Sequence, residues 1–127
     1  MNADELLGKA NRALRSAKTL QADGDFEGAC NRAYYAMFDA ARAALLLVKA
    51  DVPEEITKTH NGLARAFSLH LIKTNQLPVE LGKALKQVEN FRLLADYDGS
   101  VIEMADVNWS IARAEAFVLE VTGLLVK

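Results

Sequence analysis

A few polar residues of this chain are chemically suited to contact a phosphate group. Arg92 and Asp96 are four residues apart in a segment with helical hydrophobic periodicity. Measured from Leu85, they lie at about −20° and +20° on a helical wheel, beside the apolar stripe rather than opposite it. A base followed by an acid at this spacing is also the less favourable order for an isolated helix. The placement indicates either a partly buried ion pair that fixes helix register or a polar site inside a groove.

A second polar group lies on one face of the segment 26–49. Arg32, Tyr35 and Asp39 fall on the same side of a helical wheel. An arginine can bind a phosphate through two hydrogen bonds, a tyrosine can stack on a base, and an acid can hold the guanidinium in place. The alternative is a solvated helix face. We favour a contact face, for a partner helix or a polyanion, because Tyr35 interrupts the charges and Gly28 costs helix stability.

The two histidines are His60 and His70. His60 is expected in the first turn of a helix, where the helix dipole disfavours the imidazolium and keeps the ring neutral. A neutral imidazole suits a proton acceptor and equally suits an ordinary exposed residue. Because ten residues on one helix separate the pair by roughly 15 Å, the sequence predicts no metal site from them.

Amphipathic helices account for the hydrophobic pattern of the whole chain. They are expected over residues 3–21, 26–49, 60–73, 78–96 and from about 106 onwards. Thr57 or Thr59 can cap the third helix and Asp106 the fifth, while Pro78 suits the first position of the fourth. No strand pattern or internal repeat is present. The sequence predicts one domain over residues 1–127, an all-α, five-helix up-and-down bundle.

Length and composition limit the classes of function. A chain of 127 residues, 51% hydrophobic and 25% charged, is typical of one soluble globular domain. A net charge of −2 argues against a protein that coats nucleic acid by bulk charge but allows a local basic patch. Cys30 is the only cysteine, which excludes an intramolecular disulfide and a thiolate metal cluster. The N-terminus lacks a secretory signal and no apolar run could span a membrane, so we expect a cytoplasmic protein.

Common catalytic signatures are absent from the sequence. It contains no Gly-rich phosphate loop, no His-Glu-x-x-His, no Gly-x-Ser-x-Gly and no calcium loop. Hydride transfer, serine hydrolysis and P-loop ATP hydrolysis are therefore disfavoured. We expect no cofactor and no metal, and we find no DNA-specific motif.

Three sequence blocks resemble the HEPN domain (higher eukaryotes and prokaryotes nucleotide-binding). They are Asn31-Arg-Ala-Tyr-Tyr-Ala-Met-Phe-Asp-Ala-Ala-Arg42, Thr59-His60-Asn-Gly62 and Phe91-Arg92-Leu-Leu-Ala-Asp96-Tyr97. The similarity covers nearly the whole chain and is greatest to the small stand-alone bacterial and archaeal branch. It implies an α-helical bundle that forms a homodimer, in which equivalent helices build a shared groove.

The resemblance also implies an activity. Many HEPN proteins are metal-independent ribonucleases, often toxins paired with a minimal nucleotidyltransferase antitoxin. Their active residues follow Arg-x(4–6)-His, in which the arginine stabilises the scissile phosphate and the histidine exchanges protons with the ribose hydroxyl. Arg92 matches the arginine, but Tyr97, Asp98 and Gly99 occupy the positions of the histidine. The motif is therefore degenerate in this chain.

Three hypotheses follow. In the first, a HEPN-fold homodimer binds a nucleotide, RNA or a nucleotidyltransferase partner, as the HEPN half of a toxin–antitoxin-like pair. Its groove would contain Arg32, Tyr35, Asp39, His60, Arg92, Asp96 and Tyr97. In the second, an active ribonuclease uses Arg92 to steady the phosphate and His60 or Tyr97 to transfer the proton, which requires His60 to fold across to Arg92 and Asp96. In the third, the chain is a purely structural dimerisation module.

Overall fold

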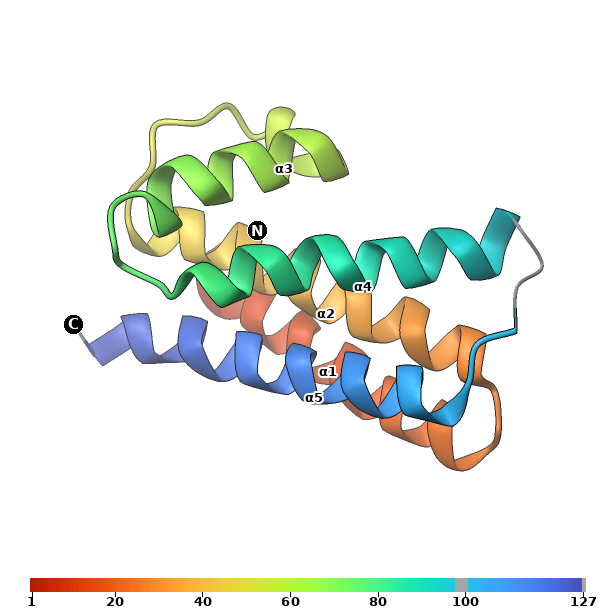
Figure 1. Ribbon diagram of the computed structural model, residues 1–127. Coiled ribbons are helices and arrows are strands. Elements are labelled where there is room, and N and C mark those ends of the chain that lie inside the picture. Colours follow the sequence, from red (N-terminus) through yellow and green to blue (C-terminus); the bar gives the residue numbers. More distant parts are fainter. Residues whose placement is uncertain (98–100, 127) are drawn as a thin grey trace.

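The chain folds into α-helices joined by short connections (Figure 1). The computed structural model describes residues 1–97 and 101–126, apart from the side chains of Ala95 and Tyr97. The helices are α1 (Ala3–Ala22), α2 (Phe26–Leu47), α3 (His60–Phe67), α4 (Val79–Tyr97) and α5 (Met104–Thr122), with shorter turns η1 (Ile56–Lys58), η2 (Ser68–Ile72) and η3 (Gly123–Val126). The described residues contain no strand, which confirms the predicted all-α class. None of the described helices combines the length and hydrophobicity that crossing a bilayer requires.

Side-chain caps determine where α2 and α3 begin. The Asp25 carboxylate accepts a hydrogen bond of 2.9 Å from the Gly28 N–H, and the Thr59 hydroxyl accepts one of 3.1 Å from the Gly62 N–H. A Cβ at Gly62 would lie 2.2 Å from the carbonyl oxygen of Ile56, so only glycine permits this approach of η1 to α3. The turn therefore fixes the position of the first residue of α3.

The third and fifth helices differ most from the predicted ones, and the ends of the others agree within two residues. Glu103, rather than Asp106, is the N-cap of α5, and the Asp106 carboxylate instead accepts from the Glu103 N–H at 3.0 Å, because an acid three residues after the cap completes a capping box. The predicted helix 60–73 is α-helical only to Phe67. It continues as the π-helical turn η2, closed by a bond of 2.9 Å from the Lys73 N–H to the Ser68 carbonyl.

Helix α2 forms the centre of the bundle and packs against α1, α3, α4 and α5 (Figure 1). Seven of its alanines have no exposed surface: Ala29, Ala33, Ala36, Ala40, Ala41, Ala43 and Ala44. Small side chains on so many positions let the neighbouring helices approach closely. Residues 48–59 lead the chain back along α2, so that α3 begins beside the middle of α2 and next to α4.

Candidate functional site

Four polar side chains from three helices meet where α3 begins. Tyr34 comes from α2, His60 from α3, and Glu89 and Arg92 from α4. We call these residues the polar cluster. Tyr34 and Glu89 are buried, with 1% and 5% of their surface exposed, whereas the side chains of His60 and Arg92 are 27% and 17% exposed. The cluster therefore has a closed floor and an accessible rim.

Arg92 is held by carboxylates on both sides. Its Nε and Nη2 donate to the two carboxylate oxygens of Glu89 at 3.0 and 2.9 Å, and its Nη1 donates to Asp96 at 3.2 Å. The hydrogen bonds to Glu89 raise the pKa of Arg92 above its ordinary value. Its guanidinium also lies 5.0 Å from the centre of the Tyr34 ring, within the range of a cation–π contact. The bidentate pair explains why Arg92 sits beside an apolar stripe, since a buried carboxylate requires a partner.

His60 contacts cluster residues that are far from it in the sequence. Its Nδ1 shares a hydrogen bond of 2.7 Å with the Tyr34 hydroxyl and lies 4.0 Å from a carboxylate oxygen of Glu89. Burial raises the pKa of Tyr34, and the negative charge of Glu89 raises it further, so the hydroxyl keeps its proton. A neutral imidazole has one N–H and one acceptor nitrogen. In the tautomer that carries its hydrogen on Nδ1, His60 donates to the Tyr34 oxygen and has a lone pair on Nε2.

Other predicted site residues lie around this cluster. Asp96 is at its exposed edge, paired with Arg92. The Tyr35 ring is 5.9 Å from the Arg92 guanidinium and packs edge-on against the Tyr34 ring at 5.1 Å. The side chain of Tyr97 lies outside the described residues, although its backbone closes α4.

The other two predicted residues on the polar face of α2, Arg32 and Asp39, lie away from the cluster, each in a different environment. Arg32 lies 5.7 Å from the Tyr35 ring and lines a separate hollow with Arg12 and Arg15. Asp39 is only 5% exposed, and burial raises its pKa against the opposing charges of nearby lysine and arginine side chains. The structure therefore does not gather Arg32 and Asp39 into the polar cluster.

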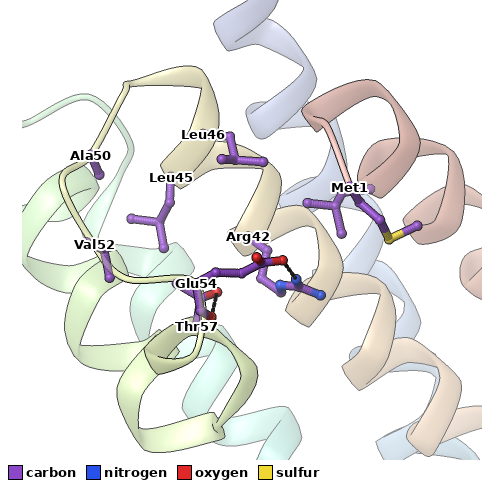
Figure 2. Close-up of a pocket in the computed structure, with 9 residues that line it drawn as sticks. Met1, Arg42, Leu45, Leu46, Ala50, Val52, Glu54 and Thr57 are labelled. Atoms are coloured by element: carbon purple, nitrogen blue, oxygen red, sulfur yellow. Dashed lines mark hydrogen bonds and ion pairs between the residues drawn. The ribbon is translucent and has the colours of Figure 1, made fainter.

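Arg42, on the same face of α2, lies at another cavity of about 190 Å³ (Figure 2). Its Nη2 is 3.8 Å from the Glu54 carboxylate, and apolar side chains such as Leu45 and Val52 form much of the wall. Among the described residues, Arg42 Nε is the one buried side-chain nitrogen or oxygen without a hydrogen-bond partner. That atom is shielded from the cavity as well as from solvent, so this place offers little for a polar ligand.

Tyr34 and Glu89 are the cluster residues that the sequence analysis did not select. Glu89 lies about 40° from Leu85 on the helical wheel, so the signal that identified Arg92 would also have identified Glu89. Nothing in the sequence distinguishes Tyr34 from the neighbouring Tyr35. The cluster offers a proton acceptor, a proton donor and a cation within one partly buried site. No group of three or more His, Cys, Asp or Glu side chains in the described part of the chain could hold a metal ion.

Comparisons with known proteins identify relatives over most of this chain. A UPF0332 protein of Gloeobacter violaceus is 33% identical over 116 residues, which cover 90% of this chain and 88% of the relative. A Methanocaldococcus jannaschii protein named as a candidate toxin is 31% identical over 124 residues, 97% of this chain and 81% of the relative. A UPF0332 protein of Thermotoga maritima is 33% identical over 120 residues, 92% of this chain and 86% of the relative. The model of the HEPN domain family matches residues 3–124, and the chain therefore belongs to that family.

Proposed function

We propose that this chain is the HEPN half of a toxin–antitoxin-like pair and binds RNA at the polar cluster as a homodimer. The observation that carries the proposal is the meeting of His60 with Tyr34, Glu89 and Arg92, since these side chains come from three helices and form a site with an accessible rim. Membership of the HEPN family supports it. So does the similarity to two M. jannaschii proteins that are named as candidate toxins.

Arg92 is the group we assign to phosphate. A guanidinium carries five N–H groups, and the hydrogen bonds to Glu89 and Asp96 occupy three of them. The other two remain for a phosphate oxygen. Asp96 is the more exposed of the two acids, so its displacement from Arg92 would make room for an anion without disturbing the buried Glu89 pair.

The protein partner that we propose is a minimal nucleotidyltransferase acting as antitoxin. Expression of the chain alone should arrest growth, and co-expression with a nucleotidyltransferase encoded by an adjacent gene should relieve the arrest. Co-purification of the two chains from those cells would support the pair. Arrest that persists beside a soluble nucleotidyltransferase would contradict it.

RNA cleavage is the second candidate function, and the contact of His60 with Tyr34 favours it. With its Nδ1 held by Tyr34 and attracted to Glu89, His60 would use Nε2 to accept the proton of a ribose 2′-hydroxyl. That oxygen would then attack the adjacent phosphorus and form a 2′,3′-cyclic phosphate as the bond from phosphorus to the 5′-oxygen breaks. The leaving 5′-oxygen would take its proton from the imidazolium of His60 or from water, while Arg92 stabilises the negative charge of the phosphate. His60 would thus supply, from α3, the base that the degenerate motif in α4 lacks.

The test compares the two histidines, because His70, in η2, is the other histidine of the chain and lies outside the polar cluster. His60→Gln should lower cleavage of a labelled single-stranded RNA by about 100-fold or more, with RNA affinity nearly unchanged. His70→Gln should leave both unchanged. Equal cleavage by the two variants would exclude a catalytic role for His60. If the wild-type chain binds RNA but does not cleave it, RNA binding without ribonuclease activity is the function that remains. If the wild-type chain neither binds RNA nor arrests growth, only the third hypothesis, a purely structural dimerisation module, remains.

A further inference from the structure

A groove lined by basic side chains runs between α3 and α4. We call it the cationic groove; its basic residues are Arg65 on α3, Lys73 after η2, and Lys83 and Lys86 on α4. All four are exposed, and the groove has a volume of about 830 Å³. Among the described residues that line it, none is acidic. For a chain of net charge −2, this is a marked local concentration of positive charge.

The cationic groove opens onto the polar cluster. His60 lines one part of the groove and also holds the hydrogen bond with Tyr34, so the two sites share a residue. Two acids of α4 lie nearby but do not line the groove, although Glu80 shares a neighbouring hollow with Lys83. That hollow also contains Arg113, and Glu89 is buried against Arg92.

We propose that the cationic groove holds the phosphate backbone of a single RNA strand that passes the polar cluster. This inference rests on the proposed function, which it deepens by giving the strand a path. Cations in a groove that is lined by no acidic side chain of the described residues bind a polyanion by releasing its counterions. Phe67, the one Phe, Tyr or Trp residue in the described part of the wall, is buried, and His60 is held by Tyr34 at the end that meets the polar cluster. Along the rest of the groove the contacts are therefore to phosphates and carry no base sequence.

The experiment measures how RNA affinity depends on salt. A fluorescein-labelled single-stranded RNA is titrated with the full chain between about 50 and 200 mM salt, and the slope of log affinity against log salt is compared among variants. Lys83→Gln/Lys86→Gln should reduce the magnitude of the slope by about 1.4, since each lost phosphate contact contributes roughly 0.7 for a single strand. Lys18→Gln/Lys49→Gln removes the same charge outside the groove and should leave the slope unchanged. Both variants alter exposed side chains, and circular dichroism checks that they fold.

Each outcome has a distinct meaning. A smaller slope for the groove variant alone supports the path. Wild-type binding with equal slopes for both variants overturns the path but leaves RNA binding at the polar cluster intact. Absence of wild-type binding overturns the proposed function and the path together. If polyglutamate at equal charge concentration displaces the RNA, the groove binds an acidic peptide, and the proposal that it holds an RNA strand is overturned.

Discussion

Two buried carboxylates in this molecule have opposite surroundings. Glu89 on α4 and Asp39 on α2 are equally buried, with 5% of their surface exposed. Glu89 receives two hydrogen bonds from Arg92 and lies 4.0 Å from His60. Asp39 forms no ion pair within the described residues, and only the more distant charges of basic side chains offset its burial.

The difference shows how one fold uses buried charge in two ways. At Glu89 the acid is compensated, and it positions the arginine and histidine that we assign to RNA. At Asp39 burial raises the pKa, so the charged form is disfavoured in the folded chain. A buried acid is therefore informative only together with its partners.

The largest expected effect is at the compensated acid. Glu89→Leu should lower the free energy of unfolding by about 3 kcal/mol, because it leaves the partly buried guanidinium of Arg92 without its bidentate acceptor. Urea denaturation monitored by circular dichroism measures the loss. In the double variant Glu89→Leu/Arg92→Leu both charges are removed, and most of the stability should return. If the double variant is as unstable as the single one, the pair does not act as a unit.

A smaller effect of opposite sign is expected at Asp39. Its folded pKa is raised, so the contribution of Asp39 to stability is complete below the unfolded pKa of about 3.9 and is lost as the pH rises through the folded pKa. Asp39→Asn cannot ionise and should unfold at a higher temperature than the wild type at pH 7. The gap should close as the pH falls towards about 4. Asp51→Asn, at an exposed loop position, is the control and should track the wild type at every pH.

The smallest effect is expected at Arg32. Arg32→Ala should change the free energy of unfolding by less than about 0.5 kcal/mol, since Arg32 makes no ion pair among the described residues and lines an open hollow. It should also raise the pKa of Asp39 slightly further, because its charge is one of those that lower it. Thermal melts beside Arg12→Ala, from the same hollow, test this. A loss as large as that of Glu89→Leu would make Arg32 structural.

The bundle itself could be predicted because helical periodicity and capping are local properties. Thr59, one of the two threonines expected to cap the third helix, caps α3. The prediction failed at Asp106, where two acids three residues apart could each be the cap, and only the extended backbone of Glu103 decides between them. It also failed at η2, since a π-helical turn leaves no trace in hydrophobic spacing.

The candidate site could be predicted only in part. Arg92 stood out because a charge on an apolar stripe requires an explanation, and Glu89 carried the same signal. The approach of His60 to Tyr34 depends on the path of residues 48–59, which periodicity does not describe. Arg32 and Asp39 lie on the same face of α2 as Tyr35. This face extends over more than one helical turn and contacts different neighbouring elements along its length, so residues that share it do not all meet at one site.

The alanines of α2 determine where this chain can vary in evolution. Each of the seven fully enclosed alanines faces a neighbouring element, so adding even one methylene there overpacks the interior, at about 1–3 kcal/mol. The exposed positions of α1 and α5 have no such restriction. Among related chains, α2 should therefore diverge most slowly, even at alanines that touch no ligand. Slow divergence along α2 would then reflect the close spacing of the helices. By itself it would not identify the residues that contact RNA.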